Sequence, residues 1–381
     1  MKKKILVVTG TRAEYGLLRS TMDELLKSKC FSLSVLVTGM HTLKKYGNTQ
    51  TEVKKDGYPV VATVPVSEKD EQYQSLAKET KGIGDFLMHS RPDCVLVLGD
   101  RDEPLAAAMA AAHLNIPIAH IHGGDRSGFV IDEPTRHALT KFSNLHFTIC
   151  PSSGRRVRQL GEEPWRVHVV GAPGFDEILS MRYSSRAAVA KKLKLDPTRR
   201  WILVVHHPTV TDPIPLKEQV KPLLYVLGTE YKDDEKIVVY PNSDTGSAAF
   251  IEEFEKMERK DRFHLFRTFE RETFLNVFKQ AACMVGNSSA GIIESGALHI
   301  PILSIGGRQR DRERGSNVLE ADYDATNICK GMQKVLSPDF VKMTKKAKSP
   351  YGKGGVGKKI VALLERLLNH PRLRYKEFND A

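Results

Sequence analysis

The sequence predicts an α/β fold of two Rossmann-like, doubly wound domains with a central cleft, and three observations support this prediction. Short apolar runs alternate with stretches in which apolar residues recur at helical spacing, which is typical of parallel strands joined by helices. The alternation stops between residues 171 and 200 and then begins again. The chain has 381 residues, and at about 150 residues per domain this length suggests two domains or one large one.

The first half contains six apolar runs that predict strands, at residues 5–8, 33–37, 95–98, 116–121, 147–150 and 167–170. Helices are predicted between these runs. Apolar side chains recur at helical spacing over 17–26, an Ala-rich helix fits 105–114, and a further helix lies around 136–142. Strands that alternate with helices in this way indicate a doubly wound parallel sheet.

A stretch rich in Arg and Lys, with Ser184, Ser185 and Pro197, separates the two halves. The second half then contains five more apolar runs, which predict strands at 201–205, 237–240, 264–266, 284–285 and 302–305. We therefore place the domain boundary near residue 172. No period of about 20 to 50 residues recurs, which excludes solenoids and propellers.

Charge and cysteine content narrow the function classes. Subtracting 46 Asp and Glu from 58 Lys and Arg gives a net charge of +12, which suits nucleic acid, an acidic surface or small anionic substrates. The densest basic stretches, 308–314 and 345–348, lack interleaved aromatic residues, which favours phosphate-bearing small ligands over a polynucleotide. The five cysteines are widely spaced without a C-x-x-C pair, which argues against a disulfide framework or structural zinc.

Targeting signals are also missing from the sequence. No apolar run approaches the roughly 20 residues of a membrane span, and the apolar segment at 5–8 is too short for a signal-peptide core. We therefore expect a soluble, cytoplasmic protein that has no membrane partner.

Polar residues follow the predicted strands of the first half, where parallel sheets bind ligands. After 5–8, Gly10 and Arg12 offer a phosphate site, although a plain turn with an exposed Arg is an equal alternative. Three acidic groups, Asp100, Asp125 and Asp132, lie after the strands at 95–98 and 116–121. Carboxylates gathered beside a cleft suit proton abstraction at a sugar carbon. For any single one of them, helix capping or a salt bridge is the more common role.

The second half carries two comparable loops. His206 and His207 follow 201–205, and either a buried structural role or a catalytic one fits them. The Ser-rich loop at 286–291 opens a helix and suits a pyrophosphate, while Glu294 would hold ribose hydroxyls. No H-E-x-x-H or similar metal spacing occurs, and the segment 353–358 only imitates a phosphate loop, because Lys359 occupies the Ser or Thr position.

Seven short motifs occur in an order that resembles one enzyme family. They are Gly10-Thr-Arg-Ala-Glu-Tyr-Gly16, Thr38-Gly-Met-His41 with Tyr46-Gly-Asn-Thr49, Gly99-Asp-Arg101, His120-Ile-His-Gly-Gly124, Tyr240-Pro-Asn242, Gly286-Asn-Ser-Ser289 and Gly307-Arg-Gln309. On these motifs the sequence resembles the UDP-N-acetylglucosamine 2-epimerases, and most of all the hydrolysing branch that makes N-acetylmannosamine for sialic-acid-type sugars.

The resemblance implies a glycosyltransferase-B architecture. Residues 1–172 would form an N-terminal domain with the acid and base residues, joined by a C-terminal helix at 366–381. Residues 173–365 would form the nucleotide-binding domain. The resemblance further implies a UDP-sugar substrate, no metal or redox cofactor, no nucleic-acid partner, and a homo-oligomer, either a dimer or a tetramer.

The family reaction removes the C2 proton of the sugar, eliminates UDP to give a 2-acetamidoglucal, and adds water to release N-acetylmannosamine. By motif, Asp100 and Asp132 match acidic catalytic positions and His207 matches a cleft histidine. The substrate-binding positions that the resemblance implies are Arg12, His41, Arg136, Asn242, Ser288, Ser289, Glu294 and Arg308.

One departure from the family concerns the acid/base residues. Many relatives carry Glu between the Ile and the Gly-Gly, where this chain has His122. Either Asp125, three residues on, supplies the missing carboxylate, or His122 itself shuttles the proton, since an imidazole titrates near neutrality.

Several functions remain open on the sequence. One alternative is a hydrolysing 2-epimerase that acts on a related nucleotide sugar, UDP- or GDP-diacetylbacillosamine. A non-hydrolysing UDP-N-acetylglucosamine 2-epimerase would share the fold and donor site but release the nucleotide-linked sugar. A glycosyltransferase of the same architecture needs an acceptor surface. A basic nucleic-acid-binding protein, suggested by charge alone, would show steep salt dependence of polynucleotide binding.

Overall fold

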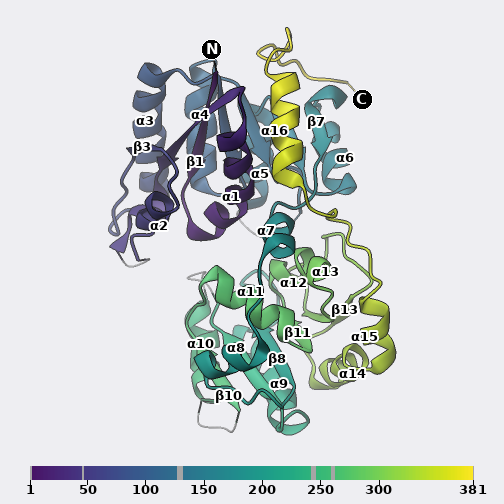
Figure 1. The fold of residues 1–381 in the computed structure, drawn as a ribbon. Coiled ribbons are helices and arrows are strands. Elements are labelled where there is room, and N and C mark those ends of the chain that lie inside the picture. Colours follow the sequence, from purple (N-terminus) through teal and green to yellow (C-terminus); the bar gives the residue numbers. More distant parts are fainter. Residues whose placement is uncertain (1, 45–46, 127–131, 242–245, 259–261, 381) are drawn as a thin grey trace. The chain divides into compact units, whose positions relative to one another are not determined.

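The computed structural model describes residues 2–44, 47–126, 132–241, 246–258 and 262–380. They fold into two compact units, each built around one parallel sheet (Figure 1). The first unit contains residues 2–126, 132–177 and 352–380, and the second contains the described residues of 178–351. The α/β class and the two doubly wound sheets that the sequence predicts are confirmed.

The first unit has a seven-stranded sheet in the order β3-β2-β1-β4-β5-β6-β7, and all neighbouring strands are parallel. Its strands are β1 (Lys3–Thr9), β2 (Phe31–Val37), β3 (Val60–Thr63), β4 (Cys94–Leu98), β5 (Ile118–Ile121), β6 (Leu145–Thr148) and β7 (Val167–Val169). Every residue of the central strand β4 is buried, as expected for a parallel sheet with helices on both faces.

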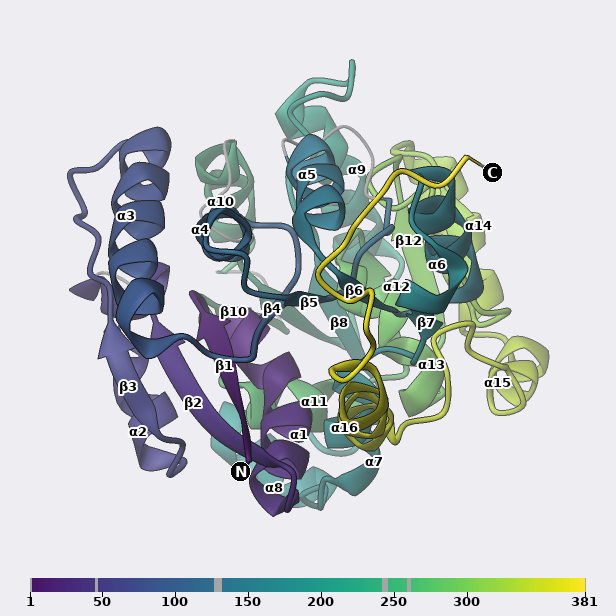
Figure 2. The same ribbon diagram turned by 90° about the horizontal axis from the view of Figure 1, so that it is seen from above.

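The helices of the first unit form a layer on each face of this sheet. They are α1 (Arg12–Lys27), α2 (Gln50–Lys55), α3 (Gln72–Ser90), α4 (Asp102–His113), α5 (Asp132–Phe142), α6 (Pro151–Gln159) and α16 (Val356–Leu367), with 3-10 turns η1 (Gly39–Thr42) and η3 (Pro164–Arg166). Figure 2 shows α3, α4 and α5 along one face and α1 and α16 along the other. The strand order is that of a Rossmann-like sheet.

Helix α16 belongs to the first unit although it lies near the end of the chain. Its residues Ile360 and Leu364 are fully buried in the same apolar core as Leu18 of α1, and the two helices lie side by side (Figure 1). The first unit runs to residue 177, within α7 (Gly174–Ser180), whereas the sequence led us to expect its limit at 172. The segment that returns to this unit starts at 352, whereas we expected it to start at 366. A limit at 366 would cut through the buried face of α16.

The second unit repeats the design with six parallel strands in the order β10-β9-β8-β11-β12-β13. The strands are β8 (Trp201–Val205), β9 (Glu235–Val239), β10 (Phe263–Phe266), β11 (Cys283–Gly286), β12 (Ile302–Ile305) and β13 (Val318–Ala321). The helices are α8 (Arg186–Leu193), α9 (Leu216–Thr229), α10 (Ser247–Glu255), α11 (Arg271–Gln280), α12 (Ser289–Ile293), α13 (Ser295–Leu298), α14 (Ala325–Val335) and α15 (Pro338–Thr344). Apolar residues of α9, α10 and α14 share one buried core with the sheet.

Candidate active site

Strand order marks two places where ligands are expected. In the first sheet β1 lies between β2 and β4, and in the second β8 lies between β9 and β11, so the chain crosses to opposite sides of the sheet at these strands. Open parallel sheets bind ligands beyond the carboxyl ends of the strands at such switch points. The loops after β1 and β4, and those after β8 and β11, are therefore the candidate sites of the two units.

A buried arginine organises the loops after β4 and β5. The Arg136 side chain on α5 is 1% exposed, and its guanidinium donates to Asp100 Oδ2 from Nε, at 2.9 Å, and from a second nitrogen. A third nitrogen donates to the Asp125 carbonyl oxygen at 2.8 Å and to Glu133 Oε2 at 2.5 Å. Burial alone would lower the pKa of Arg136, but the Asp100 carboxylate outweighs it and the pKa is raised. The cation thus fixes Asp100 at the end of β4.

The departure from the family pattern lies in the same network. His122 Nδ1 is 3.6 Å from Asp125 Oδ2, and Asp125 Oδ1 accepts a hydrogen bond from the Ser153 hydroxyl at 2.9 Å. His122 adopts a left-handed backbone with φ +76°, a region that costs a non-glycine residue about 1 to 2 kcal/mol. Gly124, also left-handed at φ +75°, approaches the Ser153 carbonyl so closely that a Cβ would lie 2.2 Å from it. The His122 and Asp125 side chains therefore lie next to each other, although the sequence analysis treated them as alternative proton carriers.

Asp132 lies in the same unit, as do the loops after β1 and β2. Asp132 is the first residue of α5, and the charges of Glu103 and, less strongly, of Asp132 raise the pKa of Arg101. Arg12 Nε pairs with Glu52 Oε2 at 3.1 Å, with both side chains about two fifths exposed. His41 is fully buried between Thr9 Oγ1, at 3.2 Å, and Thr49 Oγ1, at 2.7 Å, and burial lowers its pKa to about 4. His41 is therefore neutral at physiological pH.

Three carboxyl groups are buried near these loops, those of Glu14, Glu79 and Glu103, and the sequence analysis listed none of them as a site residue. Glu103 fills the space beside Gly10 and Gly39, where a Cβ would lie 2.3 and 2.5 Å from its side chain. Burial and the nearby Glu103 raise the pKa of Glu14 well above its ordinary value and that of Glu79 to about 8. The only hint of these carboxyl groups in the sequence is the pair of glycines Gly10 and Gly39, each after a Thr. A glycine can indicate that another group approaches the backbone closely, but it does not show which group.

In the second unit, Asn287 ties three loops together. Its side-chain oxygen accepts from the His207 backbone N–H at 2.7 Å, and its amide donates back to the His207 carbonyl at 2.8 Å. Its own carbonyl accepts from Arg308 at 3.2 Å and from Gln309 at 3.1 Å. Burial and the charge of Arg308 lower the pKa of His207 to about 3, so its imidazole is neutral. Sequence reasoning listed His207 and Arg308 but gave Asn287 no role.

The Ser-rich loop follows β11. Ser288 caps α12 and accepts a hydrogen bond from the Ala290 N–H at 3.4 Å, and Ser289 is the first residue of that helix. Glu294 is buried after α12, and Arg271 lies 2.9 Å from its Oε2. No pattern in the sequence pointed to Arg271, because it follows a different strand, β10. Asn242, a predicted nucleotide contact, lies outside the described residues.

The structure thus gathers the predicted residues into separate sets. Asp100, Arg136, Asp125 and His122 form one network in the first unit, with Arg12 and His41 in neighbouring loops. His207 and Arg308 meet through Asn287 in the second unit, where Glu294 pairs with Arg271. Across the described ranges, no group of three or more His, Cys, Asp or Glu is arranged to hold a metal ion, and no helix has the length and apolar character to cross a membrane.

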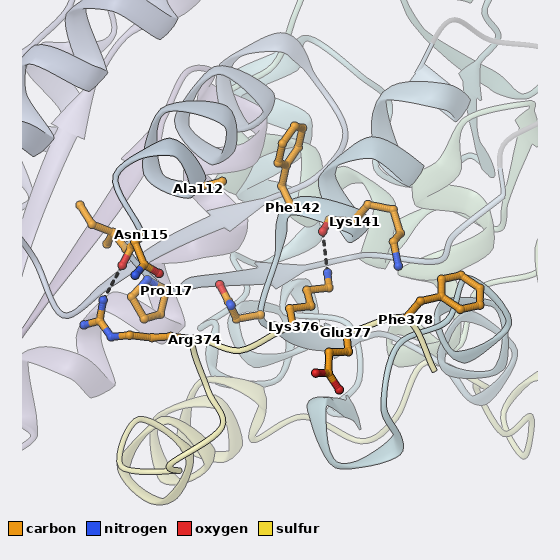
Figure 3. Close-up of a pocket in the computed structure, with 11 residues that line it drawn as sticks. Ala112, Asn115, Pro117, Lys141, Phe142, Arg374, Lys376, Glu377 and Phe378 are labelled. Atoms are coloured by element: carbon orange, nitrogen blue, oxygen red, sulfur yellow. Dashed lines mark hydrogen bonds between the residues drawn. The ribbon is translucent and has the colours of Figure 1, made fainter. Parts of the chain in front are cut away.

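One pocket of the first unit lies away from these residues. It has a volume of about 370 Å³ and is lined by the ends of α4 and α5 and by the C-terminal segment (Figure 3). Its basic side chains are already bound, since Arg374 donates to the Asn115 carbonyl and Lys376 donates to the carbonyls of Thr140, Lys141 and Ser143. These contacts attach the C-terminal segment to the first unit, and we therefore do not assign a ligand to this pocket.

Comparison with known proteins identifies the family. Residues 23–365 match the family model described as UDP-N-acetylglucosamine 2-epimerase. The chain is 36% identical to the UDP-N,N'-diacetylbacillosamine 2-epimerase (hydrolyzing) of Legionella pneumophila, over 99% of each chain. It is 31% identical to the polysialic acid biosynthesis protein P7 of Escherichia coli, over 99% of this chain and 97% of that protein.

Solved structures agree on the fold. The chain matches the UDP-GlcNAc 2-epimerase of Neisseria meningitidis, solved with UDP-GlcNAc bound, with a TM-score of 0.81 and 20% identity over 95% of this chain and 100% of that chain. The match therefore extends over the whole glycosyltransferase-B-like fold. The family model and the two relatives above 30% identity show more than the fold: this chain belongs to the UDP-N-acetylglucosamine 2-epimerase family.

Proposed function

We propose that this protein is a hydrolysing 2-epimerase that converts a UDP-linked 2-acetamido sugar into UDP and the free sugar epimerised at C2. The observation that carries the proposal is the network of Asp100, Arg136, Asp125 and His122 at the ends of β4 and β5. It supplies a carboxylate and an imidazole, the two group types best suited to moving a proton near neutral pH. The Legionella relative, 36% identical and named as a hydrolyzing 2-epimerase, supports the same reaction class.

The reaction requires two steps. A base takes the C2 proton, the C–H electron pair forms a C1=C2 double bond, and the C1–O bond breaks so that UDP leaves with its electrons. Water then adds its oxygen to C1, and C2 receives a proton on the opposite face. Asp100, Asp132 and the His122 region would move these protons, while Arg12 would contact phosphate and His41, being neutral, would accept or donate a hydrogen bond.

The second unit would hold the nucleotide. Ser288 and Ser289 offer hydroxyls and backbone N–H groups to the pyrophosphate, and Arg308 adds a positive charge beside the neutral His207. Glu294 would bind ribose hydroxyls while Arg271 fixes its carboxylate. Asn242 would line the same site. Asn287 binds the His207 backbone and accepts from Arg308 and Gln309, so the protein itself holds these loops together, which suits a site built before the ligand arrives.

UDP-N,N'-diacetylbacillosamine is the substrate that we propose first, because the Legionella relative with that activity in its name matches this chain over its full length. UDP-N-acetylglucosamine is the second candidate, because a UDP-N-acetylglucosamine 2-epimerase of Neisseria meningitidis is 32% identical over 88% of each chain. In the second case the product, N-acetylmannosamine, would feed sialic-acid-type biosynthesis, as the name of the Escherichia coli relative suggests.

Proton NMR in D₂O tests the proposal. The protein is incubated with each UDP-sugar and with the GDP-linked form of the first. We expect free UDP and a free 2-epimerised sugar that carries deuterium at C2, with a faster rate for one UDP-sugar. A product that stays linked to UDP would instead show a non-hydrolysing epimerase, and no conversion of any of these substrates would refute the proposal.

A further inference from the structure

The loop after β5 holds a histidine in an unusual backbone state. His122 has φ +76°, whereas the two residues after it are glycines, which adopt such angles freely. The strain is held in place from three sides: the His122 N–H donates to the Phe147 carbonyl at 3.1 Å, Gly123 packs against His120, and Gly124 packs against the Ser153 carbonyl. Strain of this kind persists only where the surroundings enforce it, and it is concentrated at functional sites.

Asp125 is poorly placed to meet a substrate itself. It is 5% exposed, and both carboxylate oxygens face protein groups, Oδ1 the Ser153 hydroxyl at 2.9 Å and Oδ2 the His122 Nδ1 at 3.6 Å. Its backbone carbonyl is bound by Arg136. His122 is more exposed, and its Nε2 makes no hydrogen bond within the part of the chain that the structure describes. The carboxylate thus faces one ring nitrogen and leaves the other one for a ligand.

We propose that His122 and Asp125 form a dyad in which His122 Nε2 exchanges the C2 proton with the sugar, and Asp125 and Ser153 act as positioning residues. This inference rests on the proposed function. In the elimination step, the Nε2 lone pair takes the C2 proton, the C–H electrons form the C1=C2 bond, and UDP leaves with the C1–O electrons. The imidazolium that results has its Nδ1–H directed at the Asp125 carboxylate, which stabilises the positive charge.

The charged residues around the dyad are consistent with His122 as the proton carrier and Asp125 as its positioning residue. Arg136 neutralises Asp100 and holds the Asp125 carbonyl, and Arg156 of α6 donates to the Gly124 carbonyl. His120 on β5 lies close enough to feel the His122 charge, but burial lowers the pKa of His120 to about 3 and keeps it neutral. Asp125 is therefore the carboxylate that directly faces the His122 ring.

Chemical rescue tests the dyad. In His122→Gly, glycine suits the positive φ and leaves space for added imidazole. We expect kcat to fall about 100-fold or more, with the thermal unfolding temperature and UDP affinity unchanged, and millimolar imidazole to restore it at least about tenfold. Asn115→Gly is the matched control, because it makes the same change at another left-handed residue, φ +53°, before β5.

The positioning residues give a second readout. In His122→Gly/Asp125→Asn the added imidazole loses its partner, so rescue should disappear, and Ser153→Ala should lower kcat with little effect on KM. A folded His122→Gly protein that keeps more than a third of wild-type kcat, or one whose loss no imidazole restores, would overturn the dyad. Wild-type protein that converts no nucleotide sugar would instead refute the proposed function.

Discussion

Single carboxyl groups in the first unit show how far environment decides residue chemistry. Asp100 and Glu79 are both acidic residues beside the same sheet, yet Asp100 is bound by the guanidinium of Arg136 and Glu79 is buried with only the Thr38 hydroxyl, 3.2 Å away, on one oxygen. The desolvation of Glu79, assisted by Glu103, raises its pKa to about 8. Near neutral pH, Glu79 is therefore protonated, whereas Asp100 lies in an ion pair with Arg136.

The protonation of Glu79 predicts how stability depends on pH. Its pKa is about 8 in the folded state against 4.5 for the ordinary group, so folding favours the protonated form. The stability that this group contributes is complete below pH 4.5 and is lost as the pH rises to about 8. Glu79→Gln should therefore raise the free energy of unfolding at pH 8 by on the order of 1 to 3 kcal/mol and leave it nearly unchanged at pH 5.

Urea titrations of wild type and Glu79→Gln at pH 5 and pH 8 check this prediction. Asp85→Asn, on the same helix but 57% exposed, is the control and should change little at either pH. Equal effects of Glu79→Gln at both pH values would mean that Glu79 is ionised in the folded protein.

At the residue scale, sequence patterns predicted which groups follow each strand but not how they pair. Asp100, Asp125 and Arg136 were all candidates, but the contact of Asp125 with Ser153 joins loops after β5 and β6 and depends on the exact turn of two glycines. Likewise, the partner of Arg12 is Glu52 on a helix that the sequence analysis did not predict. Such pairs join residues that are far apart in the sequence, so a local sequence pattern does not reveal them, whereas the end of a strand is visible in the sequence around it.

Among the elements, the buried central strands and the edge strands β7 and β10 were predicted, whereas the edge strands β3 and β13 were not. The prediction for 201–205 coincides with β8, which is buried throughout. The strands β3 (Val60–Thr63) and β13 (Val318–Ala321) have four residues each and are only partly buried, so they leave at most a short apolar signal in the sequence. Helix α3 was also missed, because Gly82 and Gly84 interrupt its pattern, and Gly82 is needed where the helix meets Val64.

The C-terminal segment after α16 is attached through polar contacts that no periodicity could reveal. Arg166 is 1% exposed and donates to the carbonyls of Asn144, at 3.2 Å, Arg372, at 2.9 Å, Leu373, at 3.0 Å, and Tyr375. Glu163 adds an ion pair to both Arg166 and Arg372 at 2.9 Å. The buried guanidinium of Arg166, which lies just before β7, thus binds the residue before β6 and the segment at 372–375.

Removing Arg166 should loosen this segment. Arg166→Ala leaves four carbonyls without their donor, so we expect a loss of about 3 kcal/mol or more in the free energy of unfolding. Hydrogen exchange should become faster in residues 369–379 before it does so in β1 or β4. Arg158→Ala, an exposed arginine of α6, provides the comparison and should leave exchange in that segment as in wild type. Unchanged protection of the segment in Arg166→Ala would show that apolar contacts hold it instead.

On the scale of the whole molecule, the sequence predicted two doubly wound sheets because each half carries its own series of apolar runs. The strand orders are β3-β2-β1-β4-β5-β6-β7 and β10-β9-β8-β11-β12-β13. In both sheets the first strand of the unit, β1 or β8, lies inside the sheet, and short connections add the later strands on either side of it. The limits of the units were harder to predict, since α7 spans one limit and α16 returns from the end of the chain. The net charge of +12 fits an anionic ligand but does not indicate which unit binds it.

Nucleotide binding tests the division of labour between the units. UDP at 100 times its dissociation constant should stabilise the protein by about 2.7 kcal/mol, and the slowing of hydrogen exchange should concentrate in the second unit, over 206–209, 286–294 and 306–309. Glu294→Ala should weaken UDP binding about tenfold or more, because it removes an acceptor for ribose hydroxyls, whereas exposed Glu272→Ala on α11 should not. A DNA oligonucleotide should bind weakly and lose affinity steeply with salt. Protection that instead falls mainly on the loops after β1 and β4 would move the nucleotide to the first unit and reverse the roles that we assign to the two sheets.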